Sequence, residues 1–247
     1  MNIDGKTALV TGAAGGIGRA LVLELLDNGA SKIIACDLDR KQLNDIAARD
    51  TRVVPQELDV TDEAEVARVA AAHGDVDLLI NCHGIVVHEN YLAAATLGAF
   101  RKEMDVNYWG QLLLCRAFAP VVNRNAGGAI VNFLSPLAFV TFPFCAAYCA
   151  TKAACRVLTD AMRAELGPKG VLVMAVCPGT IDTGMMSNLD IPKSPPEGVA
   201  KAVVEGLSSD ETEVWAGEGA QDMRQRLRDD PEALQAEAAK WLRLEQN

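Results

Sequence analysis

The stretch Thr11-Gly12-Ala13-Ala14-Gly15-Gly16-Ile17-Gly18 decides which fold we expect for this chain. The apolar run at residues 7–11 predicts a β-strand before it, and residues 17–28 predict a helix after it that stops at Gly29. Glycines in such a turn permit a tight backbone and let a pyrophosphate approach the positive end of the helix. Alone, the string is weak evidence, because a strand–helix turn without any ligand can carry it too.

The alternation of strand and helix continues along the chain. Further strands are predicted at residues 32–37, 52–59, 76–81, 129–134 and 171–177, and helices at 39–50, 61–73, 97–122 and 148–166. Thr61 is the expected cap of the helix that begins there. Strands separated by helices of this length imply parallel crossovers. We therefore expect an α/β fold: a Rossmann-type doubly wound parallel sheet in three layers, with helices on both faces, as a single domain over residues 1–247.

The character of the sequence changes after Pro178. Residues 184–210 are expected to form a substrate flap, and within them a helix is predicted near 196–207. A short strand is predicted near 213–216. Residues 221–247 predict a helical C-terminal tail, whose apolar stripe is typical of packing or of a subunit contact. The stripe consists of Leu227, Leu234, Ala238, Trp241 and Leu242.

Composition excludes several classes of function. The formal net charge is -10 and no cluster of Lys and Arg is present, which argues against nucleic acid as a partner. The uncharged stretch at 127–151 contains Pro136 and Pro143 and does not read as a membrane span. The N-terminus does not resemble a signal peptide. The seven cysteines and three histidines form no zinc pattern, so we expect reduced thiols, no metal and a cytoplasmic protein.

Asp37 strengthens the nucleotide interpretation. It ends the second predicted strand, 19 residues after Gly18. A carboxylate at that position can accept hydrogen bonds from the adenosine ribose hydroxyls, and it would repel the 2′-phosphate of NADP. Arg19 and Arg40 are near enough in sequence to soften this repulsion, but neither replaces the aspartate. The sequence therefore predicts NAD as cofactor, in preference to NADP.

A second constellation is Tyr148-Cys-Ala-Thr-Lys152. Residues i and i+4 share a helix face, so the ammonium can lie near the phenol and lower its pKa from about 10. A tyrosine perturbed in this way can act as a general acid or base. The pair alone is common on protein surfaces, but small residues around it favour close packing. Ser135 follows the strand predicted at 129–134, where ligands collect in parallel sheets.

Taken together, these residues resemble the short-chain dehydrogenase/reductase family, in its shorter single-domain branch, over roughly residues 5–183. The family's motifs occur in order, and Ser135 precedes Tyr148 by the family's usual 13 residues. The matching motifs are Thr11-Gly-x-x-x-Gly-x-Gly18, Asp59-Val60, Asn81-Cys-His-Gly84, Asn107, Ser135, Tyr148-x-x-x-Lys152 and Pro178-Gly-Thr-Ile-Asp-Thr183.

The resemblance implies a role for each matched position. Tyr148 would exchange a proton with the substrate oxygen, Lys152 would lower the pKa of Tyr148 and hold the nicotinamide ribose, and Ser135 would bind the substrate oxygen. Asn107 would order a water that relays protons through Lys152. The implied cofactor contacts are Gly12, Gly16, Ile17, Gly18, Asp37, Leu38, Asp59, Val60, Asn81, Gly84, Tyr148, Lys152, Pro178, Ile181 and Thr183. The implied activity is NAD-dependent interconversion of an alcohol and its ketone.

The resemblance also implies a homotetramer or homodimer that pairs the helices at 97–122 and 148–166 across a two-fold axis. Three departures concern the substrate side: His83 in the Asn81–Gly84 turn, Pro136 after Ser135, and an ending after Met186 unlike that of the family. Aromatic residues before Tyr148, with two methionines, could line an apolar pocket for a hydrophobic secondary alcohol, or could belong to core or interface. They are Phe139, Phe142, Phe144, Met185 and Met186.

Other functions fit the same residues less well. The spacing Gly12-x-x-Gly15-x-x-Gly18 is also that of sugar-nucleotide epimerases, but these need a further C-terminal domain for which few residues follow Pro178. An NAD-binding sensor or scaffold without turnover is the alternative from another class. Such proteins tend to lose the tyrosine or the lysine, and a dehalogenase-like relative would lose Asp37 and Lys152.

Overall fold

The computed structural model describes residues 1–125, 127–187 and 190–241. In this part of the chain seven strands form one sheet in the order β3-β2-β1-β4-β5-β6-β7, and every neighbouring pair is parallel. The strands are β1 (Thr7–Thr11), β2 (Lys32–Asp37), β3 (Val53–Glu57), β4 (Leu78–Asn81), β5 (Ala129–Phe133), β6 (Leu172–Pro178) and β7 (Glu213–Ala216). The predicted doubly wound Rossmann-type sheet is confirmed.

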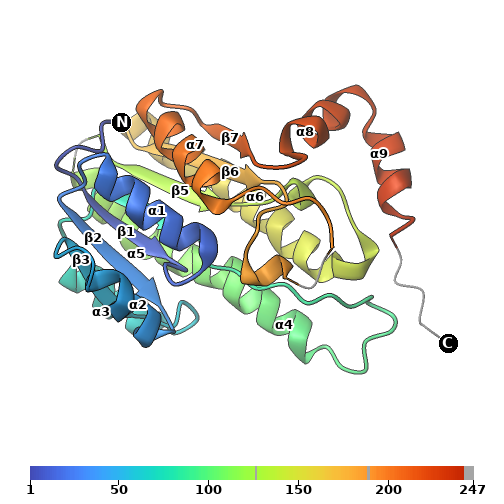
Figure 1. Cartoon of the computed structure of the whole chain (residues 1–247), viewed down its shortest axis with the longest axis horizontal. Helices are drawn as coiled ribbons and strands as arrows, with labels where there is room; N and C mark the ends of the chain where they lie inside the picture. Colours follow the sequence, from blue (N-terminus) through green and yellow to red (C-terminus); the bar gives the residue numbers. More distant parts are fainter. Residues whose placement is uncertain (126, 188–189, 242–247) are drawn as a thin grey trace.

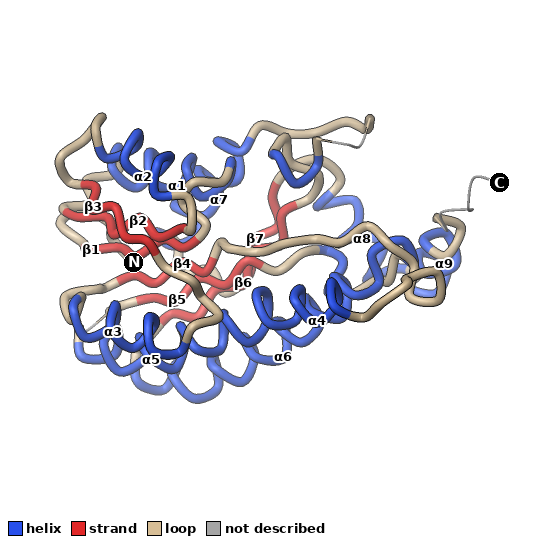
Figure 2. Tube along the Cα trace, turned by 90° about the horizontal axis from the view of Figure 1, so that it is seen from below, coloured by secondary structure: helices blue, strands red, loops and turns tan. Residues whose placement is uncertain are grey.

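Helices cover both faces of the sheet (Figures 1 and 2). One face carries α1 (Gly16–Asp27), α2 (Arg40–Ala47) and α7 (Pro196–Ser208), and the other carries α3 (Glu63–Ala72), α5 (Gln111–Arg124) and α6 (Ala146–Leu166). Strand residues are buried on both sides: Ala8 and Val10 pack into one hydrophobic cluster, and Leu9 packs into another. This burial explains why the strands read as continuous apolar runs rather than as alternating ones.

Two local predictions were wrong in detail. The helix expected at 97–122 is interrupted, because α4 (Gly98–Met104) passes through a π-helical turn at Asp105–Gly110 before α5 begins. The cap of α3 is Asp62 rather than Thr61, since the Asp62 carboxylate accepts hydrogen bonds from the amides of Ala64 and Glu65. The hydroxyl of Thr61 instead donates a hydrogen bond to the carboxylate of Asp59.

The parallel register gathers the strand ends at one edge. Thr11 pairs with Asn81, Asn81 with Asn132, and Phe133 with Val176, so the segments that follow β1, β4, β5 and β6 lie side by side. Ligands bind at this carboxyl edge in open α/β sheets.

The chain beyond β6 forms the remaining elements. After a short turn at Gly184–Met186, Ser194 pairs with Ile181. Residues 188–189 of the expected flap, and Leu242 with the rest of 242–247 in the expected tail, lie outside the described residues. The described tail forms α8 (Ala220–Asp229) and α9 (Pro231–Ala238). No helix within the described ranges is both long and apolar enough to cross a membrane.

Gly18 shows how tightly the first turn is packed. A Cβ atom on Gly18 would lie 2.0 Å from the carbonyl oxygen of Gly12, a backbone atom that cannot move aside. We expect Gly18→Ala to lower the free energy of unfolding in urea by at least about 2 kcal/mol, as overpacking does. Gly198→Ala in α7 is the matched control, because its Cβ would meet nothing within 4 Å. Equal stability of the two variants would contradict this packing.

Candidate active site

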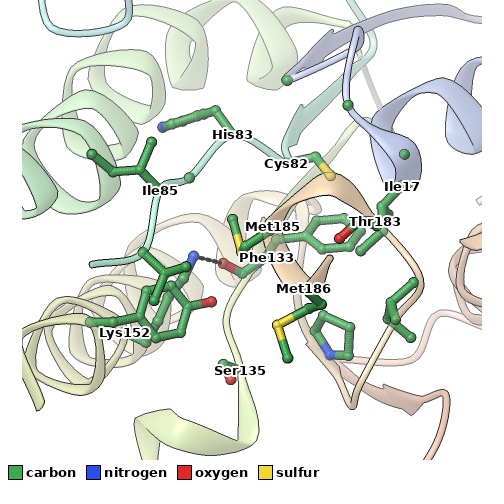
Figure 3. Close-up of a pocket in the computed structure, with 18 of the residues that line it drawn as sticks. Ile17, Cys82, His83, Ile85, Phe133, Ser135, Lys152, Thr183, Met185 and Met186 are labelled. Atoms are coloured by element: carbon green, nitrogen blue, oxygen red, sulfur yellow. Dashed lines mark hydrogen bonds between the residues drawn. The ribbon is translucent and has the colours of Figure 1, made fainter. Parts of the chain in front are cut away.

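A cavity of about 610 Å³ opens at the carboxyl edge of the sheet (Figure 3). Its wall includes the glycine-rich turn, the segments after β4, β5 and β6, and the first turns of α6. The residues of the sequence prediction that line it are Gly12, Gly16, Ile17, Gly18, Asp37, Leu38, Asp59, Val60, Gly84, Ser135, Tyr148, Lys152, Pro178, Ile181 and Thr183. Asn81 and Asn107 do not line it.

The glycine-rich turn brings bare backbone to the cavity. Gly12 has a φ of +67°, and a Cβ atom there would lie 3.0 Å from backbone atoms of Cys82 and His83. Gly15 caps α1 without a side chain, so no side-chain acceptor satisfies the amides of the first turn. Free amides at a helix N-terminus favour an anion. This part of the cavity therefore fits the pyrophosphate of a dinucleotide.

Asp37 stands beside this turn at the end of β2. Its Oδ2 accepts a hydrogen bond from the amide of Ala14 at 3.0 Å, and its Oδ1 accepts from the amide of Leu38 at 2.8 Å. These bonds fix the carboxylate at the wall of the cavity. The guanidinium of Arg40 lies 3.7 Å from the carboxylate of Glu57, so it pairs with that acid.

Tyr148 and Lys152 project from one face of α6, and Ser135 begins the segment after β5. The ammonium of Lys152 donates a hydrogen bond to the carbonyl oxygen of Phe133 at 2.8 Å and lies 5.6 Å from the centre of the Tyr148 ring. The hydroxyl oxygen of Ser135 accepts a hydrogen bond from the amide of Leu137 at 3.1 Å. The three predicted polar groups thus meet in one cavity.

The prediction that Lys152 lowers the pKa of Tyr148 stays a prediction, and burial acts on both groups of this pair. Burial raises the pKa of Tyr148, and interaction with the Ser135 hydroxyl opposes this only in part. Burial also lowers the pKa of Lys152, which is only 3% exposed. The physical reason is that both groups are removed from water, which favours the neutral form of each over its charged form.

Asn81 and Asn107 do not face the cavity but make hydrogen bonds within the structure around it. Asn81, which was expected to line the cleft, instead donates a hydrogen bond to Asn132 at 2.8 Å. Asn107 accepts from the amide of Ile85 at 2.9 Å and donates to its carbonyl oxygen at 2.9 Å. Its amide also donates to the Thr151 hydroxyl at 3.0 Å. The prediction that Asn107 orders a water stays a prediction.

Two further residues lie in or next to the wall: His83 lines the cavity, and Glu103 is buried beside the wall residue Lys102. The Nδ1 of His83 lies 2.7 Å from the hydroxyl of Thr11. Burial, with the nearby charge of Lys152, lowers the pKa of His83 to about 3, so the imidazole is neutral. Glu103 of α4 is fully buried and accepts a hydrogen bond from the amide of Val87 at 2.6 Å. No pattern in the sequence pointed to Glu103, because a charged residue on a helix ordinarily faces water.

Apolar side chains also line the cavity. They come from several separate segments and include Val86, Leu137, Phe144, Met185, Met186 and Met223. Of the aromatic residues considered for a pocket, only Phe144 reaches it. Phe139 packs on Trp215, with ring centres 5.4 Å apart, and Phe142 packs on Trp241 at 6.2 Å.

Fold and cavity together define a protein of the Rossmann class, with a tyrosine, a lysine and a serine at the carboxyl edge of the sheet. The family model described as short chain dehydrogenase matches residues 6–193. The chain belongs to the short-chain dehydrogenase/reductase family.

Individual relatives agree with this assignment. The chain is 33% identical over 214 residues to 2-keto-3-deoxy-L-fuconate dehydrogenase from Xanthomonas campestris, covering 86% of this chain and 66% of that protein. A short chain dehydrogenase from Burkholderia cenocepacia in complex with NADP has a TM-score of 0.91 and 42% identity, over 96% of this chain and 99% of that one. A family member from Burkholderia phymatum in complex with NAD shares the fold, with a TM-score of 0.82, 22% identity and 96% of each chain covered.

Proposed function

We propose that this chain is an NAD-dependent oxidoreductase that interconverts a hydrophobic secondary alcohol and its ketone. One observation carries the proposal: Tyr148, Ser135 and Lys152 line the same cavity as the glycine-rich turn and Asp37. A dinucleotide held at its phosphates and ribose could therefore reach a substrate that touches the tyrosine. The apolar wall at Leu137, Phe144 and the methionines supports a substrate with an apolar body.

The residues of the chain supply position and protons. Ser135 orients the substrate oxygen, and Tyr148 donates a proton to a carbonyl oxygen or removes one from an alcohol. When bound, the nicotinamide supplies or accepts the hydride. Because burial raises the pKa of Tyr148, the phenol is in the form that donates a proton during ketone reduction. Alcohol oxidation needs the phenolate, and the buried ammonium of Lys152 is the nearby charge that favours it.

Asp37 supports NAD over NADP. Its carboxylate is held at the cavity wall by backbone amides, and Arg40 is already paired with Glu57. Because the known relatives include complexes with either cofactor, this preference rests on the residues of this chain.

Replacing Asp37 tests the cofactor preference. We expect Asp37→Ser to shift the ratio of NADH to NADPH affinity by about tenfold or more toward NADPH, which corresponds to about 1.4 kcal/mol of lost repulsion. Asp39→Asn is the matched control, because it removes one charge two residues away and keeps an oxygen that can cap α2. Titration of both variants with each cofactor measures the ratio. An equal shift in the control would mean that overall charge, not Asp37, sets the preference.

The experiment that tests the activity is turnover of a panel of secondary alcohols with NAD and of ketones with NADH, followed by nicotinamide absorbance. Turnover of bulky apolar compounds supports the proposal. Faster turnover of small polar alcohols would reject the apolar substrate. Tight binding of NADH with no turnover across a broad panel would favour the NAD-binding sensor.

We also infer a cytoplasmic homotetramer or homodimer. The seven free thiols suit a reducing compartment. Exposed apolar side chains stand on the two helices expected to pair, with Trp109 50% and Val157 63% exposed. Light scattering that shows a monomer at micromolar concentration would reject the assembly.

A further inference from the structure

We propose that α8 and α9 act as a clasp that holds the segment 136–145 against the cavity, with Gln235 as its positioning residue, and so determine which substrates fit. This inference rests on the proposed function. Figure 1 places α8 and α9 beyond the edge of the sheet, near the chain that leads into α6. The segment 136–145 connects Ser135 to α6, so it joins two of the reacting groups.

Gln235 makes the most specific contact of the clasp. Its Oε1 accepts a hydrogen bond from the amide of Thr141 at 2.9 Å, and its Nε2 donates to the carbonyl oxygen of Thr141 at 2.9 Å. One side-chain amide therefore satisfies both backbone groups of a residue that belongs to no strand or helix. Backbone groups of a loop need such partners to hold one conformation.

Apolar packing surrounds this contact. Val140 is buried against Leu234 and Ala238, and all three are at most 3% exposed. Phe142 packs at the edge of the same cluster. The ring of Trp241 lies with its centre 6.4 Å from that of Phe144. The segment is thus held at successive positions by residues near the C-terminal end of the chain.

The held segment and the clasp both contribute to the cavity wall. Pro136, Leu137, Phe144 and Cys145 of the held segment line the cavity, and so does Met223 of α8. Within the described residues, Met223 is the only part of α8 and α9 that lines it, and the Asp37 carboxylate accepts its hydrogen bonds from the amides of Ala14, Leu38 and Asp39. A change in the clasp should therefore alter the apolar substrate wall and leave the nucleotide wall in place.

The consequence for specificity follows from what these side chains offer. Phe144 and Met223 present an aromatic ring and a flexible thioether, which favour an apolar group attached to the carbonyl carbon. A longer apolar group would make more contact with this wall than a short one. The clasp therefore contributes most to the binding of ketones with long apolar chains.

The test compares Gln235→Ala with Gln225→Ala. Gln225 is an exposed glutamine of α8 that bonds Asp229 in its own helix, so it controls for loss of an amide from the tail. With NADH and methyl ketones of increasing chain length, we expect Gln235→Ala to raise KM about tenfold for long chains and less than about twofold for the shortest. The dissociation constant of NADH should stay within about twofold of wild type. Gln225→Ala should match wild type throughout.

Two kinds of result would overturn the proposal, one in the kinetics and one in hydrogen exchange. An unchanged KM for long ketones, or the same change for short and long ketones, would overturn the specificity role. Hydrogen exchange at the Thr141 amide gives a readout that needs no turnover: slow exchange in wild type and fast exchange in Gln235→Ala are expected. Fast exchange in wild type would overturn the clasp itself. If wild type reduced no ketone while that amide stayed protected, the proposed function would fail and the clasp contact would stand.

If Gln235→Ala did not fold, Met223→Ala would test the wall separately. It removes the contact of α8 with the cavity and leaves the Gln235–Thr141 pair intact. A selective rise in KM for long ketones supports the proposal, and no change overturns it.

Discussion

Tyr148→Phe is expected to lower kcat/KM for ketone reduction about 10³-fold, because positioned general acids contribute on the order of 10²–10⁴-fold. Phenylalanine keeps the ring that packs beside Lys152 and removes only the hydroxyl that exchanges the proton. NADH affinity should therefore change less than about twofold. Steady-state kinetics and NADH titration of the same preparation measure both quantities.

Tyr108→Phe is the matched control. Tyr108 lies in the π-helical turn, packs on Trp109 and does not line the cavity. The Tyr108→Phe variant should therefore retain the kcat/KM and the NADH affinity of wild type. If Tyr148→Phe kept more than about a tenth of wild-type activity, another group would supply the proton, and the assignment of Tyr148 as general acid would be wrong.

The same substitution has a signature in pH. Because burial raises the pKa of Tyr148, the phenol keeps its proton at neutral pH. Alcohol oxidation by wild type should therefore rise as pH increases and the phenolate forms. Any activity left in Tyr148→Phe should lack this rise.

Glu103→Gln is expected to have the second large effect, on stability. Burial raises the pKa of Glu103 from 4.5 to about 7. The folded state therefore holds a proton that the unfolded state has released between these values, so wild type loses stability as pH rises from about 4.5 through about 7. The loss amounts to at most about 3 kcal/mol. Glutamine does not titrate, so the free energy of unfolding of the variant should rise relative to that of wild type as pH increases over this range. The variant should be the more stable of the two at alkaline pH.

Urea unfolding of both proteins at mildly acid and mildly alkaline pH measures this change. The titratable groups that influence or are influenced by Glu103 are Cys145, Cys149 and Tyr91. Glu165→Gln, an exposed position on α6, controls for the loss of one negative charge. A stability difference between wild type and Glu103→Gln that is the same at both pH values would show that Glu103 is charged throughout.

Local features of the sequence determined the fold and much of the cavity. The glycine spacing from Gly12 to Gly18, the apolar runs and the helical spacing of Tyr148 and Lys152 each depend on residues close together in the chain. Steric and hydrogen-bond rules act directly at that range, and parallel crossovers then bring the strand ends to one edge. Fifteen of the predicted site residues consequently line a single cavity.

Only the tertiary structure decided the properties that depend on distant neighbours. Burial raises the pKa of Tyr148, whereas the sequence showed only that a lysine lies one helical turn away. Asn81 turns toward Asn132, which is 51 residues away, and Gln235 binds Thr141 across 94 residues. Periodicity shows which face of an element is buried, but it does not show which distant segment covers that face or how much water remains there. For this reason the sequence identified the candidate reacting groups, whereas the folded chain determined their burial and the apolar side chains that line the same cavity.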